Sequence, residues 1–172
     1  MKTFYTVDRA RTLSPGQVLS PFRNGVSEEP FRTFLDDLFP NGISRHGQQY
    51  LENPNCAFSS REGALELYFE EVRKRCYQEL PSRFESIFCC ESADEAIEMR
   101  GMLHNPGVPI FEVKVDGSIH RANMSLLNNV GSILSLSHRA HEYWQGVEGG
   151  VDQGPVWEII AKLPVEVGQR IR

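Results

Sequence analysis

Two serines, each followed three residues later by a glutamate, constrain the middle of this chain more than any other feature. Ser59 with Glu62, and Ser92 with Glu95, each have the pattern of a capping box, in which two side chains satisfy the first free N–H groups of a helix. The segment between these helices, residues 82–90, is short and apolar, which is typical of a strand. The middle of the chain is therefore predicted to run helix, strand, helix.

The first of these two helices carries a single apolar stripe, and Pro81 ends the segment. The members of the stripe recur at helical spacing, and they are Leu65, Tyr68, Phe69, Val72 and Cys76. An earlier helix is predicted within residues 27–42, with Ser27 as a possible N-cap. Its apolar residues share one face, and they are Phe31, Phe34, Leu35 and Leu38.

The remaining elements determine the expected fold class. Residues 4–9 and 108–115 have strand composition, residues 156–171 read as two short strands bent at Pro164, and residues 123–144 are partly helical. Strands and helices do not alternate regularly, so the order favours a single α+β domain over residues 1–172 rather than a doubly wound sheet. Neither a GxGxxG nor a Walker phosphate loop follows any predicted strand, which argues against the two commonest nucleotide-binding folds.

Charge and hydropathy narrow the class of protein. The formal net charge of -5 argues against a generally basic surface for nucleic acid. A local basic groove remains open, and its candidates are Arg9, Arg11, Arg23, Arg73, Lys74 and Arg75. There is no apolar run of about 18 residues, and the N-terminal segment turns charged too early for a signal peptide. We therefore expect a cytoplasmic protein with no membrane partner.

The cysteines give no metal-ligand spacing, so no metal is expected. There are four of them, Cys56, Cys76, Cys89 and Cys90. Buried free thiols in a reducing compartment are the favoured interpretation, and a redox role for the vicinal pair Cys89–Cys90 is the alternative. In a strand, the side chains of this pair point to opposite faces.

Polar residues at the edges of the predicted strands are the candidates for chemistry. They are Tyr5 and Arg9 on the first strand, Ser82, Arg83 and Ser86 on the second, and Glu158 on a late one. An arginine at a strand end is usually solvated, and Ser82 with Arg83 could simply terminate the preceding helix. Glu158 lies in the apolar run "VWEII", where a charge is rarely found without a partner, so structural and functional roles both stay open.

Four blocks of the sequence resemble, in order, those of ADP-ribosyltransferase-like domains: "FYTVDRARTLSPGQVL", "SRFESIFCCESADEAIEM", "PIFEVKV" and "VWEIIAKLPVEV". The chain is similar in particular to the rifampicin-modifying ADP-ribosyltransferases and to a bacterial family with related "SRF", "YW-G" and late glutamate motifs. The resemblance spans most of the chain. It implies a split, strongly bent α+β sheet whose first, second and late strands border a cleft that holds NAD.

The resemblance also implies roles for individual residues. Glu158 matches the catalytic acidic residue, and the second motif falls within Ser82–Phe88. The NAD-binding candidates are Tyr5, Arg9, Ser82, Arg83, Ser86 and Phe88, with arginines on the pyrophosphate, serines on the ribose and aromatic rings on the nicotinamide. Where the closest pattern has a histidine after "FY", this chain has Thr6, and Arg9 is the candidate substitute.

A glycine-rich segment, residues 141–155, precedes Glu158. In the resembled family the loop before the acidic residue recognises the acceptor, which implies that Tyr143 and Trp144 are exposed aromatic residues able to stack on a base or a protein side chain. The alternative is a core tryptophan beneath a mobile loop.

The resemblance thus implies an NAD-dependent mono-ADP-ribosyltransferase, with NAD as substrate and a protein or nucleic acid as acceptor. A toxin, a defence protein or a phage effector would fit, and a toxin would allow for an inhibitory partner protein. The alternative is a non-catalytic nucleotide- or protein-binding module of the same fold. Thr6 favours this alternative, whereas Glu158 within an apolar strand favours the enzyme.

Overall fold

The computed structural model describes residues 1–23, 28–51, 61–104, 106–150 and 154–171. The strands are β1 (Lys2–Val7), β2 (Val18–Leu19), β3 (Ser86–Cys89), β4 (Ile110–Val115), β5 (Ile119–Asn123), β6 (Trp157–Lys162) and β7 (Val165–Arg170). The helices are α1 (Phe31–Leu38), α2 (Arg45–Leu51), α3 (Arg61–Cys76), α4 (Ala93–Met102) and α5 (Ile133–Gln145), with 3-10 turns η1 (Arg83–Glu85) and η2 (Met124–Leu126). Within these segments no helix is long and apolar enough to cross a membrane.

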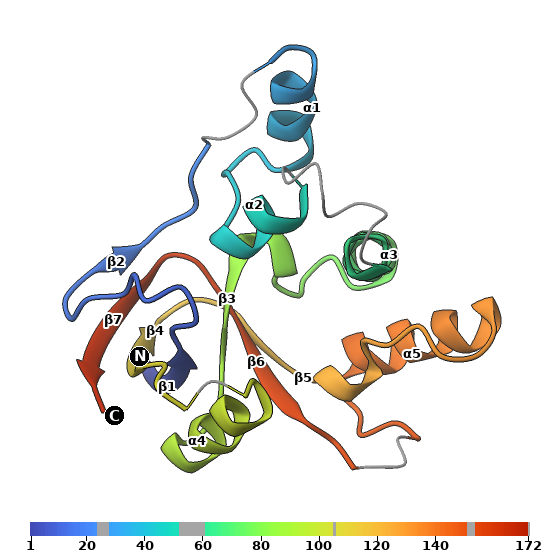
Figure 1. Ribbon diagram of the computed structural model, residues 1–172. Coiled ribbons are helices and arrows are strands. Elements are labelled where there is room, and N and C mark those ends of the chain that lie inside the picture. Colours follow the sequence, from blue (N-terminus) through green and yellow to red (C-terminus); the bar gives the residue numbers. More distant parts are fainter. Residues whose placement is uncertain (24–27, 52–60, 105, 151–153, 172) are drawn as a thin grey trace.

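The strands form two antiparallel sheets, one in the order β1-β4-β7-β2 and the other in the order β3-β6-β5. Figure 1 shows α2 and α3 on one side of the strands and α4 on the other. The predicted single α+β domain is confirmed at the level of its class. β2 and β5 were not predicted from the sequence, because each is short and neither has a clear alternation of apolar and polar residues.

The two sheets meet where β1 approaches the end of β3. Tyr5 and Cys90 exchange backbone hydrogen bonds of 3.0 and 2.7 Å. The Thr6 hydroxyl donates to the carbonyl oxygen of Phe88 at 2.8 Å. The chain also crosses between the sheets through the bend at Leu163 and Pro164, as predicted, and there the Leu163 N–H donates to the carbonyl oxygen of Glu85. The first strand, the 82–90 segment and the last strands are thereby held around one junction.

Apolar clusters position the elements around this junction. In one cluster, residues of β1, β4 and β7 from the first sheet pack against residues of β3 and β6 from the second. A second cluster joins α3 and α5 to β6, and in it the Trp144 indole N–H donates to the carbonyl oxygen of Phe69 at 2.7 Å. A third, formed by Phe39, Ile43 and Phe84, fixes η1 against the segment before α2. Apolar burial of this kind is the main driving force that fixes the helices on the sheets.

Of the local predictions for the helix starts and the 82–90 segment, one is confirmed and one is wrong. The capping box at the start of α4 is confirmed, since the Glu95 N–H donates to the Ser92 hydroxyl oxygen and Glu95 accepts from the Ser92 N–H. The predicted caps Ser27 and Ser59 lie outside the described residues. The prediction that residues 82–85 belong to the strand is wrong. The Ser82 hydroxyl accepts from the Phe84 N–H, which caps η1, and β3 begins only at Ser86.

The two predicted apolar stripes also differ in outcome. In α3, Phe69 is buried and Leu65, Tyr68 and Val72 are partly buried, whereas Cys76 at the end of the helix is exposed. Buried thiols are therefore confirmed for Cys89 and Cys90 and wrong for Cys76, and Cys56 is not among the described residues. Of the four apolar residues predicted on one face of α1, Leu35 packs against the cluster of Phe39, Ile43 and Phe84, whereas Phe31, Phe34 and Leu38 are exposed.

A substitution at Gly47 tests how tightly α2 packs on η1. A Cβ atom at this position would lie 2.5 Å from the carbonyl oxygen of Phe84, closer than atoms can approach. We expect Gly47→Ala to lower the free energy of unfolding by about 1–3 kcal/mol despite the better helix propensity of alanine. Gly101→Ala in α4 is the matched control. A Cβ there meets no atom within 4 Å, so this change should be neutral or stabilising by up to about 1 kcal/mol. Equal stability of the two variants in urea unfolding would contradict this packing.

Candidate functional site

A cleft of about 1630 Å3 lies between the sheet junction and the α2–α3 side of the domain. Residues of β1, β3 and β6, the strands for which the resemblance implied a shared cleft, are part of its lining. Among the predicted site residues, those that line it are Tyr5, Arg9, Arg83, Ser86, Phe88 and Glu158. The sequence-predicted residues of three distant segments are therefore brought together at one surface.

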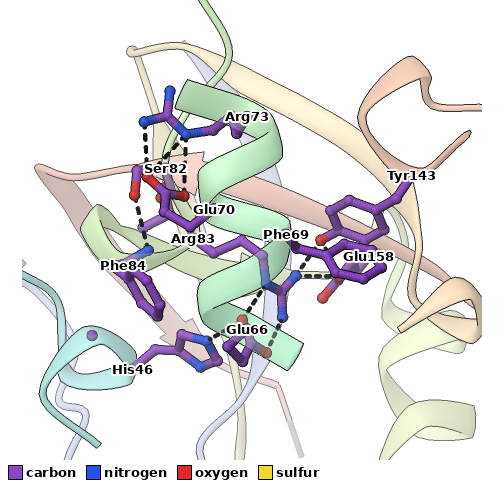
Figure 2. A network of polar contacts seen from close by, with 12 residues as sticks. His46, Glu66, Phe69, Glu70, Arg73, Ser82, Arg83, Phe84, Tyr143 and Glu158 are labelled. Atoms are coloured by element: carbon purple, nitrogen blue, oxygen red, sulfur yellow. Dashed lines mark hydrogen bonds and ion pairs between the residues drawn. The ribbon is translucent and has the colours of Figure 1, made fainter. Parts of the chain in front are cut away.

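The buried guanidinium of Arg83 is the centre of this site. Figure 2 shows it between the carboxylates of Glu66 from α3 and Glu158 from β6. Its Nε and Nη2 groups donate to the two oxygens of Glu66 at 2.7 and 2.8 Å. Its Nη1 group donates to Glu158 Oε1 at 2.7 Å and to the hydroxyl oxygen of Tyr143 from α5. The Tyr143 hydroxyl in turn donates to Glu158 Oε1 at 2.6 Å.

Burial and charge act against each other in this network. Burial alone would raise the pKa of the Glu66 carboxyl, but the Arg83 guanidinium and the His46 ring beside it hold that pKa well below its usual range. Burial would lower the pKa of Arg83, whereas Glu158 and Glu66 raise it well above its ordinary value. Burial raises the pKa of the Tyr143 hydroxyl, with Glu158 adding to the effect and Arg83 opposing it. Arg83 is thus charged and Tyr143 neutral near pH 7.

Aromatic rings enclose the ionic network. The Arg83 Cζ atom lies 4.5 Å from the centre of the Phe88 ring and 5.4 Å from that of Tyr143, distances at which a cation is attracted to a ring face. The Tyr143 ring packs edge-on against Phe69 and Trp144. The positions of the charged groups are therefore fixed by packing as well as by hydrogen bonds.

A second buried ion pair supports the first from the far end of α3. The Arg73 guanidinium binds the fully buried Glu70 at 2.8–3.1 Å, and its Nη1 group donates to the carbonyl oxygens of Gln78 and Leu80. These bonds tie the loop before η1 to the helix that carries Glu66. Arg73 is therefore part of the structure and not of a basic groove.

The two oxygens of Glu158 have different surroundings. Oε1 accepts from both Arg83 and Tyr143, whereas Oε2 receives no hydrogen bond from the described part of the chain. Two carboxylates, Glu66 and Glu158, face the single guanidinium of Arg83, so the formal negative charge of these three groups exceeds their positive charge. Such a fixed, preorganised anion can stabilise a positive charge that develops beside it.

The hydroxyl groups of Ser82 and Ser86 bond to backbone atoms of the same segment. The Ser86 hydroxyl donates to the carbonyl oxygen of Ser82 at 2.6 Å, which closes the η1 turn. Ser86 lines the cleft, but Ser82 is buried behind its wall. Arg83 lines the cleft as predicted, yet four of its five N–H groups are already bound to protein oxygens. Its geometry suits holding Glu66 and Glu158 rather than a pyrophosphate.

The expectation that Tyr143 and Trp144 are exposed is wrong. Tyr143 is 0% and Trp144 1% exposed, because both lie on the face of α5 that packs against α3 and β6. Tyr143 belongs to the site from the inside, through its hydroxyl on Glu158. The alternative of a core tryptophan is the correct one.

Two exposed arginines line the mouth of the cleft. Arg9, which follows β1, was predicted, and Arg45 at the start of α2 was not. The Arg45 Nη1 group donates to the Thr12 hydroxyl at 2.7 Å. The positive charge of the cleft is therefore at its rim, whereas the excess negative charge is in its wall.

Thr6 and Cys90 complete the β1 side of the cleft. Thr6 stands where the resembled pattern has a histidine, and its hydroxyl joins β1 to β3. Burial, with the negative charges of Glu95 and Glu158, raises the pKa of the Cys90 thiol to about 12. Among the described residues no group of three or more His, Cys, Asp or Glu side chains could hold a metal ion.

Two residues of the network, Glu66 and His46, were missed by sequence reasoning. Glu66, Glu70 and Arg73 recur at i, i+4 and i+7 on α3, next to the apolar stripe, and this spacing is a signal that buried charges share one face. His46 follows a turn-rich segment and has no comparable pattern around it, so only the tertiary structure brings it to Glu66.

Residues 4–172 match the family model described as "Protein of unknown function (DUF2441)". The chain belongs to this family. No curated protein matches it. The description of the DUF2441 family names no activity, so the resemblance to ADP-ribosyltransferases stays a prediction.

Glu66→Gln tests the ionic network through its pH dependence. The pKa of Glu66 is lowered on folding, so its ionised form stabilises the protein above about pH 4.5, and this contribution is lost as the pH falls further. We expect Glu66→Gln to lower the free energy of unfolding by about 3 kcal/mol near pH 7, since Arg83 loses a buried partner. The difference from wild type should shrink below about pH 4.5.

The control is Glu71→Gln on the same helix, where the side chain is exposed and lies 3.8 Å from Lys74. This change should have almost no effect, as is usual for surface pairs. Urea unfolding at several pH values measures both. A loss for Glu66→Gln that stayed constant down to pH 3 would contradict the assignment.

Proposed function

We propose that this chain is an NAD-dependent mono-ADP-ribosyltransferase in which the cleft binds NAD and Glu158 stabilises the ribosyl cation. The observation that carries the proposal is the environment of Glu158. Its carboxylate is buried at the cleft wall, one oxygen is held by Arg83 and Tyr143, and the other receives no hydrogen bond from the described residues. Because Glu158 lines the cleft, this second oxygen is the one available to a ligand group that donates a hydrogen bond.

The chemistry suits this geometry. Cleavage of the bond between nicotinamide and ribose passes through a state with positive charge on the ribose, as in glycoside hydrolysis. A hydrogen bond from a ribose hydroxyl to Glu158 Oε2 would place the excess negative charge of the wall beside that ribose. Because the positive charge develops only in the transition state, this contact would lower the barrier more than it would tighten the binding of NAD.

The rim of the cleft suits the pyrophosphate. Arg9 and Arg45 line the mouth, and both are exposed, so their guanidinium groups are open to a ligand. Arginine binds phosphate oxygens through charge-assisted bonds that can be bidentate. Tyr5 and Phe88 offer aromatic surface within the cleft for a planar ring. Arg83 then acts on catalysis indirectly, by fixing Glu158.

One observation favours the second candidate, a non-catalytic nucleotide-binding module. Thr6 uses its hydroxyl to join β1 to β3, so this position offers no side chain of the kind that the resembled pattern places there. In that case the cleft would bind NAD without consuming it. A measurement of NAD consumption, rather than of binding, separates the two functions.

Glu158→Gln is the catalytic test. Glutamine keeps the shape and the oxygen that accepts from Arg83 but removes the negative charge. We expect the rate of NAD consumption to fall about 10²-fold or more while the affinity for NAD changes little. Chromatographic measurement of released nicotinamide gives the rate. Glu166→Gln, on β7 and paired with Lys114 at the surface, is the control and should keep the wild-type rate. Full activity of Glu158→Gln would rule out the assigned role.

Replacement of the rim arginines tests the pose of NAD. Arg9→Ala and Arg45→Ala should each weaken NAD binding by about 1.5 kcal/mol, roughly tenfold in Kd, because each removes a charged hydrogen bond to the pyrophosphate. The exposed Arg75 of α3 does not line the cleft, and Arg75→Ala should leave Kd unchanged. Titration calorimetry measures all three. Wild-type affinity in both rim variants would refute this placement of the pyrophosphate.

A further inference from the structure

His46 contacts Glu66 at the cleft wall, although Glu66 already has Arg83 as its ionic partner. Its Nε2 atom lies 3.2 Å from Glu66 Oε2, which already accepts from Arg83 Nε at 2.7 Å. Nε2 is buried and has no well-directed hydrogen bond within the described part of the chain. Arg83 alone would bind both oxygens of Glu66, so the histidine is an addition to a pair that is complete without it.

The ring is held in position from several sides. Its centre lies 4.7 Å from the Tyr50 ring, 4.5 Å from Phe88 and 6.3 Å from Phe84. The next residue, Gly47, lets α2 approach the carbonyl oxygen of Phe84 closely, which brings the helix against the wall of the cleft. Despite this packing, the His46 side chain is 19% exposed and lines the cleft together with Glu158.

A histidine fixed by a carboxylate on a cleft has the parts of a general base. The Nε2 atom faces Glu66, so a ring that carries its proton there would offer the lone pair of Nδ1 to a proton. Glu66 stabilises the imidazolium that forms when Nδ1 takes this proton, as a carboxylate does for an orienting histidine elsewhere. Figure 2 shows His46 and Glu158 on opposite sides of the Glu66–Arg83 pair, in which Glu66 contacts His46 and Arg83 contacts Glu158.

We propose that His46 is the general base that takes the proton of the acceptor nucleophile, and that the acceptor is therefore a group that must lose a proton, such as a hydroxyl. This inference rests on the proposed function. The bond between ribose C1′ and the nicotinamide nitrogen breaks, and its electron pair leaves with neutral nicotinamide. The acceptor oxygen forms the new bond to C1′, and its proton passes to His46 Nδ1 and then to solvent. A carboxylate acceptor would need no such base.

The experiment uses water and methanol as the simplest hydroxyl acceptors. NAD is incubated with the full chain, and ADP-ribose and methyl ADP-ribose are measured with released nicotinamide. His46→Gln places an amide near the position of Nε2, so it keeps a contact to Glu66 and removes the base. We expect kcat for both products to fall about 10²-fold, with KM for NAD within about twofold. Added imidazole should restore part of kcat in this variant, which a purely structural role would not produce.

The matched control is His138→Gln on α5, where the side chain is 73% exposed, and it should behave as wild type with or without imidazole. His46→Asn is a second variant should His46→Gln fail to fold, with thermal melting as the check. An active wild type with unimpaired His46 variants, or a loss that imidazole does not restore, overturns the inference alone. A wild type that leaves NAD intact overturns the proposed function, and this inference with it.

Discussion

The guanidinium of Arg83 is the interaction on which the rest of the structure depends. A charge buried to this degree is costly unless it is paired and fully hydrogen-bonded, and the fold meets that requirement by bringing a carboxylate from α3 and another from β6 to the same group. Because the partners come from distant segments, the guanidinium specifies how helix and sheet sit together. The loss of either carboxylate would leave part of the buried guanidinium without a hydrogen-bond acceptor, so site and fold share one constraint.

The same arrangement gives the cleft a polarity. Negative charge exceeds positive charge in the wall, where side chains are buried and water screens little, whereas the arginines of the rim are exposed. A ligand with an anionic middle and a positively charged end is complementary to this distribution. Thr6, which stands where the resembled pattern has a histidine, does not disturb this distribution, because its hydroxyl bonds at the sheet junction and the charges come from other residues.

The sequence predicts a residue's role well when the residues that surround it in the structure are also its neighbours along the chain. Glu158 could be singled out because its own strand is apolar, and Ser92 because its cap partner is three residues away. The sequence identified Arg83 as a candidate site residue but did not reveal its ion pairs, since Glu66 and Glu158 are both distant from it along the chain. Tyr143 and Trp144 were misjudged from the glycines that follow them. Together with Leu136 and Ala140 they recur at helical spacing, and that period, rather than the loop, decides their burial.

The protonation of the Cys90 thiol bears on which groups in the cleft could react with a ribosyl cation. The thiolate is the nucleophilic form of cysteine, and burial with two nearby carboxylates keeps this thiol protonated. A ribosyl cation formed beside Glu158 would react with any strong nucleophile within reach. The negative charge that would stabilise such a cation also helps to keep the Cys90 thiol protonated, so this sulfur would be a poor acceptor.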